Sequence, residues 1–121
     1  MSDRDTTLEV LKQSVADFSA EREWEPFHSL KNLAMSIAIE SGELMERFQW
    51  TDVVEADASM SAAKQREAVE AELADVVIYA LQFANRANID LSDAIRRKIA
   101  LNAEKYPVER SKGNSRKYDS S

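Results

Sequence analysis

Residues 74–84 read ADVVIYALQFA, and this stretch decides the fold. Its apolar residues recur at helical spacing, but Val77, Ile78 and Leu81 fall outside the main apolar stripe. A helix that is apolar on nearly every face is normally buried on every face. In a chain of 121 residues, this happens most easily when subunits pack together. We therefore expect a buried helix here and a homo-oligomeric protein.

The composition of the chain favours helices throughout. It has only two glycines and two prolines, with 44% hydrophobic and 31% charged residues, which leaves little material for the turns of a β fold. Apolar periodicity predicts helices over about residues 6–23, 29–49, 62–85 and 90–106, with a polar connection at 51–61. Thr6 with Glu9, and Asp90 with Asp93, are the expected helix starts. We predict an all-α four-helix bundle over residues 1–107, followed by a flexible or site-covering tail at 108–121.

The charge of the chain limits its partners. The net charge is −6 and the sequence pI is about 4.8, so a nucleic-acid polymer is an unfavourable partner, whereas a small anion can be held with the help of a metal ion. Cysteine is absent, which excludes thiol chemistry. The N-terminus lacks an apolar signal region, and the longest apolar run, Val76 to Leu81, is too short to span a membrane. The expectation is a cytoplasmic protein without membrane contact.

Two pairs of acidic residues stand on apolar helices. In AIESGEL, residues 38–44, Glu40 projects about 20° from Leu33 and lies inside the apolar stripe, with Glu43 at its edge. Glu72 and Asp75 repeat this i, i+3 spacing on the next long helix. Burying an unpaired carboxylate costs several kcal/mol, and converging carboxylates raise one another's pKa values unless a cation lies among them. Oxygen ligands of this kind suit Mg²⁺, with Mn²⁺ as a substitute.

Simpler interpretations exist for each feature. An isolated Glu-x-x-Glu is usually a solvated face, and we expect Glu46, Glu67 and Glu70 to be solvated acids of this kind. Gly42 either allows close approach of another group or is a tolerated helix glycine. A di-iron site is unlike this pattern because it needs two Glu-x-x-His motifs, and the single histidine, His28, lies outside both acidic pairs.

Further candidate ligand contacts lie on the last helix and in the aromatic loops. Lys98, Asn102 and Tyr106 follow one another at i, i+4 and i+8, which fits either an interhelical hydrogen-bond network or, near a metal, contacts to phosphate and sugar. Trp24, Phe27, His28 and Trp50 supply aromatic surface, which either packs in the fold or stacks on a nucleobase.

The combination of these segments resembles the MazG-like, all-α nucleoside triphosphate pyrophosphohydrolases, and within them the single-domain dCTP pyrophosphatase branch. The resemblance rests on FHSLKNLAMSIAIESGELMERFQW (27–50), ELADVVIYALQFANRANIDL (72–91), KIALNAEKYP (98–107) and SKGNSRKY (111–118). The family signature is Glu-x-x-Glu, a spacer, then Glu-x-x-Asp. It is filled here by Glu40, Glu43, Glu72 and Asp75. The spacer, residues 44–71, is at the long end of the family pattern.

The resemblance implies a Mg²⁺-dependent hydrolase that cleaves between the α and β phosphates of a nucleoside triphosphate, with dCTP or a 5-modified dCTP as substrate and nucleotide-pool cleansing as the task. It implies a homotetramer, a dimer of dimers. The four signature acids would hold Mg²⁺, and Glu43, with Glu40, would be catalytic. The implied substrate contacts are Trp24, His28 and Trp50 around the base and Tyr79, Lys98 and Asn102 near sugar and phosphates; Arg116, Lys117 and Tyr118 either cover the site or fray.

Two alternatives remain open on the sequence. One is a related pyrophosphohydrolase for another triphosphate, such as dUTP or phosphoribosyl-ATP. The other is a non-catalytic helical interaction module that has kept the fold. The second is disfavoured because such a module gains nothing from an acid inside the apolar stripe at Glu40.

Overall fold

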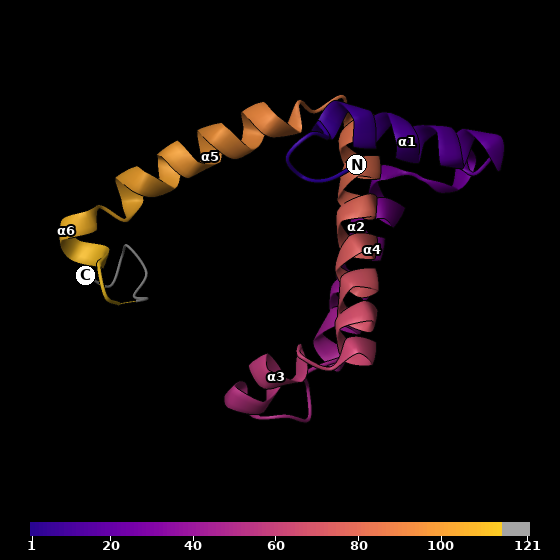
Figure 1. Cartoon of the computed structure of the whole chain (residues 1–121). Coiled ribbons are helices and arrows are strands. Elements are labelled where there is room, and N and C mark those ends of the chain that lie inside the picture. Colours follow the sequence, from indigo (N-terminus) through magenta and orange to yellow (C-terminus); the bar gives the residue numbers. More distant parts are fainter. Residues whose placement is uncertain (115–121) are drawn as a thin grey trace. The chain divides into compact units, whose positions relative to one another are not determined.

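The structure is a computed structural model that describes residues 1–114, and every regular element in that range is a helix (Figure 1). The elements are α1 (Leu8–Glu21), the 3₁₀ turn η1 (Glu25–Phe27), α2 (Leu30–Glu46), α3 (Val53–Ser59), α4 (Ala63–Ala87), α5 (Leu91–Lys105) and α6 (Val108–Ser111). The all-α prediction is confirmed. Within residues 1–114, no helix is long and apolar enough to cross a membrane.

Most of the helices begin with a capping side chain, whereas α4 and α6 begin without one, and one cap is shifted from the expectation. The N-cap of α1 is Thr7, whose hydroxyl accepts the backbone N–H of Val10 at 3.2 Å, and not Thr6. Thr6 instead donates its hydroxyl to Asp5 at 3.2 Å. Asp90 caps α5 as expected, with its carboxylate accepting from the N–H of Asp93 at 3.0 Å.

Two short helices lie where the sequence predicted none. The stretch at 51–61, expected to be a polar connection, contains α3, which Asp52 caps by accepting the N–H of Glu55 at 2.8 Å. The C-terminal segment, expected to be loop or tail, begins with one helical turn, α6. Both are too short for a clear apolar period, which explains why periodicity missed them.

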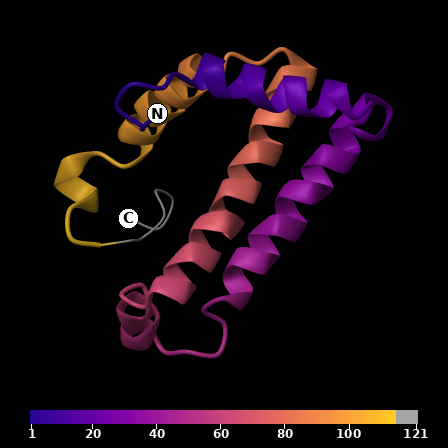
Figure 2. The ribbon, with the colours of Figure 1, turned by 45° about the vertical axis from the view of Figure 1, so that its right-hand side comes forward.

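The chain forms two compact units, one covering Met1–Asn88 and the other beginning at Ile89. In the first unit, α2 and α4 run side by side, and α1 crosses one end of α4 (Figure 2). The second unit contains α5 and α6. The expected single domain over 1–107, with α5 as the fourth helix of a bundle, therefore stays a prediction.

Little apolar surface is buried within the first unit. The buried apolar side chains of the described residues are Leu33, Val69, Leu81 and Ala84. In contrast, Ile39 on α2 is 59% exposed and Val77 on α4 is 43% exposed. The apolar faces that the sequence predicted to be buried on α4 are thus only partly covered by the other helices of the first unit.

Candidate active site

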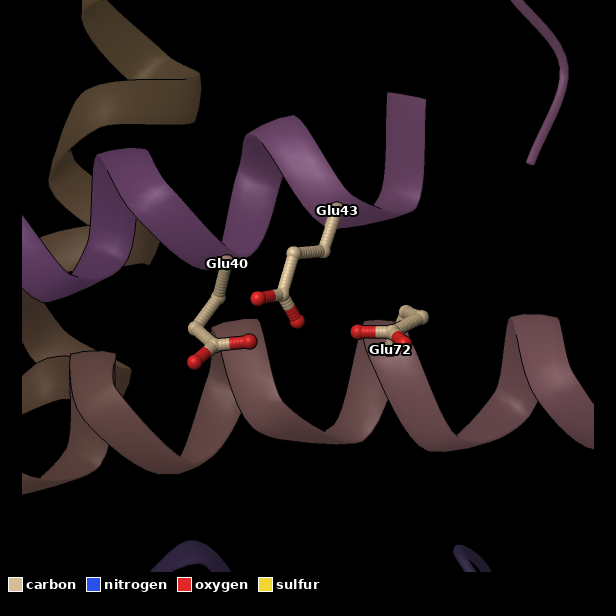
Figure 3. A group of neighbouring side chains, drawn as sticks. All are labelled: Glu40, Glu43 and Glu72. Atoms are coloured by element: carbon tan, nitrogen blue, oxygen red, sulfur yellow. The ribbon is translucent and has the colours of Figure 1, made fainter. Parts of the chain in front are cut away.

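Three carboxylates meet between α2 and α4. Glu40 and Glu43 come from neighbouring turns of α2, and Glu72 comes from the facing side of α4 (Figure 3). One carboxylate oxygen from each lies within 4.8 Å of the other two. The i, i+3 spacing places Glu40 and Glu43 on one face of α2, and the packing of α2 on α4 brings Glu72 opposite them.

The electrostatics of this cluster are unfavourable without a cation. Glu40 and Glu72 are half-buried, and the Oε2 atom of each is buried with no hydrogen-bond partner within residues 1–114. Burial raises the pKa of Glu40 above its ordinary value of 4.5, and hydrogen bonding with Glu43 and the charges of Glu43, Asp75 and Glu72 raise it further. The pKa of Glu72 is also raised, first by burial and then by the hydrogen bonding and negative charge of Glu43.

Asp75, the fourth acid of the expected set, stands one helical turn beyond Glu72 and is half-buried. Its negative charge raises the pKa values of both Glu40 and Glu72, so it belongs to the same electrostatic environment. It is not among the three residues whose oxygens lie within 4.8 Å. Its role as a ligand remains a prediction.

Arg47 is a residue near this cluster that the sequence did not single out. Its positive charge lowers the pKa of Glu72, against the other influences on that group. Its guanidinium donates to the Oε1 atom of Gln65 at 2.6 and 3.2 Å, and Gln65 donates back to the carbonyl of Arg47 at 3.0 Å. Arg47 thereby fastens the end of α2 to the start of α4, close to the acids.

The donor set fits a hard divalent cation. All the available ligand atoms are carboxylate oxygens, the ligand type that Mg²⁺ and Mn²⁺ prefer. A cation would also give the two buried Oε2 atoms the partner that they lack and would offset the repulsion that raises the pKa values of Glu40 and Glu72.

The expected base-contact residues lie at the two ends of α2. Trp24 stacks edge-on against His28, with ring centroids 6.3 Å apart, just before α2 begins. Trp50 follows α2 and is 88% exposed. Since α2 has 17 residues, it is about 26 Å long, so the two ends of one chain cannot both touch one base.

The remaining expected contacts divide between the two units. Tyr79 lies on α4, one turn beyond Asp75, and is half-buried. Lys98 and Asn102 are exposed on α5, in the second unit. Arg116, Lys117 and Tyr118 lie outside the described residues.

A cavity of about 330 Å³ with a mixed polar and apolar lining lies beyond the acids, where α1 meets α4 and the start of α2. Its lining includes Leu33, His28 and three polar residues of α1 and α4: Ser19, Gln82 and Asn85. Sequence reasoning missed these three. Gln82 could have been found from the sequence, because it is the single amide within the apolar run 76–84. Like Asn102, it occupies a position where a hydrophobic residue is expected.

Comparisons with known proteins agree with this geometry. The chain matches the MazG-like family over residues 35–120. It is 41% identical to dCTP pyrophosphatase 1 of Mus musculus and 39% identical to that of Homo sapiens, each over 93% of this chain and 66% of the relative. A solved structure of a pyrophosphatase from Archaeoglobus fulgidus has a TM-score of 0.78 and 38% identity, covering 88% of this chain and 98% of that one.

The chain therefore belongs to the MazG-like family, and its all-α fold is that of the family. It spans 66% of the length of the curated mammalian relatives that it matches.

Proposed function

We propose that this protein is a Mg²⁺-dependent nucleoside triphosphate pyrophosphohydrolase, with dCTP or a 5-modified dCTP as substrate. The observation that carries the proposal is the group of Glu40, Glu43 and Glu72, with two buried oxygens that have no partner, in a chain 41% identical to a dCTP pyrophosphatase. Cleansing of the nucleotide pool in the cytoplasm is the task that fits this activity.

The residues that would hold Mg²⁺ are Glu40, Glu43, Glu72 and Asp75. When bound, the ion would supply positive charge that attracts the phosphates and offsets the charge developing at the reacting phosphorus. This arrangement also explains how a protein with a net charge of −6 holds a polyanionic substrate.

The reaction is a hydrolysis at the α–β phosphoanhydride. The oxygen of water forms a bond to phosphorus, the bond from phosphorus to the bridging oxygen breaks, and the products are the nucleoside monophosphate and pyrophosphate. Glu43 is exposed, whereas Glu40 is half-buried, so Glu43 is the carboxylate that can orient water and take its proton. Glu40, one turn before Glu43 on α2, would hold the same ion and so keep Glu43 beside the phosphate.

The substrate contacts proposed from the resemblance need more than one copy of the chain. Trp24 and His28 would contact the base from one chain, and Trp50, at the opposite end of α2, would come from another. Tyr79, Lys98 and Asn102 would contact sugar and phosphates. The exposed apolar residues of α2 and α4, such as Ile39 and Val77, supply the surface for assembly into the proposed tetramer.

Assembly is tested by Val77→Glu, which places a charge on the apolar face of α4. The expected result is a smaller species by light scattering and analytical ultracentrifugation, with Lys64→Glu, on an exposed part of the same helix, as control. A wild-type chain that is monomeric at micromolar concentration would contradict the tetramer.

The activity is tested by incubating the purified protein with Mg²⁺ and, separately, each common dNTP, dUTP and 5-methyl-dCTP. Nucleotides are separated chromatographically and pyrophosphate is assayed. We expect monophosphate and pyrophosphate in equal amounts, fastest from a cytosine nucleotide, and no turnover in EDTA. Release of inorganic phosphate instead of pyrophosphate would contradict the proposed cleavage site.

A further inference from the structure

In the cavity beside α1, two hydrogen bonds fix the orientation of one side-chain amide. Gln82 is only 8% exposed, and its Nε2 atom donates to the carbonyl of Val15 at 3.1 Å and to the hydroxyl of Ser19 at 2.6 Å. Ser19 is itself 3% exposed. Because a carbonyl oxygen can only accept, the nitrogen end of the Gln82 amide must face α1.

This arrangement uses both hydrogens of the amide and leaves its oxygen available. The Oε1 atom of Gln82 has no hydrogen-bond partner among residues 1–114, and it is not one of the buried atoms without a partner. Gln82 lines the cavity. The chain therefore presents a fixed acceptor there and offers no competing donor from the same side chain.

The walls of the cavity are fixed by similar bonds. Asn85 donates to the carbonyl of Lys12 at 2.9 Å, which ties α4 to α1. Arg86 donates to the carbonyl of Glu25 at 3.0 Å, which holds the loop that carries Trp24 and His28 against α4. The cavity is thus lined by α1, the loop around η1, α2 and α4, and its lining includes both the His28 ring and the amide acceptor.

The cavity and the acidic cluster are separated along the same two helices, α2 and α4. Glu40 follows Leu33 by seven residues, about 10 Å along α2, and Glu72 precedes Gln82 by ten residues, about 15 Å along α4. Tyr79 lies between the two places on α4. A nucleotide has its sugar between its base and its phosphates, so it can reach from the cavity to the carboxylates.

We propose that this cavity takes the pyrimidine base and that the Oε1 atom of Gln82 selects an exocyclic amino group, favouring cytosine over uracil. The inference rests on the proposed function, because it assigns the base of the same nucleotide substrate. The exocyclic amino group of cytosine would donate a hydrogen bond to Oε1 of Gln82. In uracil a carbonyl oxygen replaces this amino group and would face Oε1, so that two acceptors meet. The amide of Gln82 cannot rotate to present its nitrogen, because both of its hydrogens are already used.

Ser19 is a positioning residue in this scheme. It contacts the amide and not the base, and it keeps the Gln82 oxygen directed to the cavity. Ser19→Ala leaves the acceptor in place but removes one of the two bonds that fix it. The preference for cytosine is then reduced, while Gln82→Met, which removes the acceptor at similar volume, abolishes it.

The test is equilibrium binding of dCMP and of dUMP to the full-length protein by titration calorimetry. Wild type should bind dCMP about tenfold more tightly than dUMP, and Gln82→Met should bring the ratio of the two dissociation constants close to one. Gln65→Met is the matched control, because Gln65 is on the same helix but its oxygen is already taken by Arg47. That variant should keep the wild-type ratio.

Two results would overturn the inference: a ratio near one in wild type, or a ratio that both Gln82→Met and Ser19→Ala leave unchanged. Ser19→Ala is a small truncation and keeps the test available if Gln82→Met fails to fold. Because monophosphate binding needs no hydrolysis, the two proposals fail separately. Gln82-dependent dCMP binding without pyrophosphate release contradicts only the proposed function. Cytosine-selective hydrolysis that does not depend on Gln82 contradicts only this inference.

Discussion

Two polar clusters lie along the pair formed by α2 and α4, and they are built in opposite ways. The carboxylates of Glu40, Glu43 and Glu72 share one charge sign, and two of their buried oxygens have no partner. The amides of Gln82 and Asn85 are neutral, and their nitrogens are bonded to α1. The first cluster lowers the free energy of unfolding unless a cation is bound, whereas the second stabilises the packing of α1 on α4 without any ligand.

The difference shows how polar groups in one helix pair serve separate purposes. A satisfied amide network keeps one geometry, which suits recognition. A set of unsatisfied acids stores an electrostatic cost that a cation removes, which suits binding of a metal and a polyanion. Substitutions in the two clusters should therefore affect different measurements.

The largest effect is expected from Glu72→Gln. Removing one carboxylate of the acidic cluster should lower kcat/KM for dCTP by at least about 100-fold, since even the partners of metal ligands contribute 10- to 100-fold. Enzyme kinetics with saturating Mg²⁺ measure this. Glu67→Gln, an exposed acid on the same helix, is the control and should stay within about twofold of wild type. Equal losses in both variants would show that helix charge, and not the cluster, is responsible.

The second prediction concerns pH and the metal-free protein. The pKa values of Glu40 and Glu72 are raised in the folded state, so the unfolded chain releases its protons first as pH increases. The free energy of unfolding should therefore fall as pH rises above the ordinary value of 4.5. Mg²⁺ should restore it on the alkaline side, where the acids are ionised.

Denaturant unfolding between pH 4 and 7, with and without Mg²⁺, measures this slope. Glu40→Gln should flatten the metal-free curve, because it removes one of the two shifted groups. A metal-free protein that becomes more stable over this range, with Glu40→Gln having no influence on the slope, would contradict the description of the acids as an unpaired cluster.

A smaller effect is expected from Asn85→Ala in the neutral cluster. It removes the hydrogen bond to the carbonyl of Lys12 and should lower the free energy of unfolding by about 1 kcal/mol. Mg²⁺ affinity should not change, because Asn85 is on the cavity side of α4 and not among the acids. Chemical denaturation and a Mg²⁺ titration of the same variant check both halves, and a weakened Mg²⁺ affinity would show that the clusters are coupled.

The smallest effect is expected from Gly42→Ala, between Glu40 and Glu43. A Cβ at position 42 would meet no atom within 4 Å among residues 1–114, apart from the neighbouring backbone of its own helix. The helix should therefore gain about 0.5–1 kcal/mol from the better helix former. Thermal unfolding measures this gain. A loss of stability or of activity would indicate that a second subunit or the substrate closely approaches Gly42.

The sequence predicted the parts of the molecule that follow from local pattern. Apolar spacing indicated the four long helices, and the side chain of Asp90 caps α5 as expected. The position of Glu40 inside an apolar stripe predicted an acid that needs a partner, and its Oε2 atom is buried without one among residues 1–114. The short helices α3 and α6 were missed because they are shorter than the window in which a period can be recognised.

The tertiary structure decided what lies opposite what. Glu72 lies near Glu40 and Glu43 only because α4 packs against α2. The amide of Gln82 has one orientation only because Val15 and Ser19 of α1 accept its hydrogen bonds. These partners are 63 or more residues away in the case of Gln82, so no local pattern records them. The sequence by itself determined the helices and the acids that they carry. Packing determined which groups are left unsatisfied, because burial and partner geometry exist only once the helices meet.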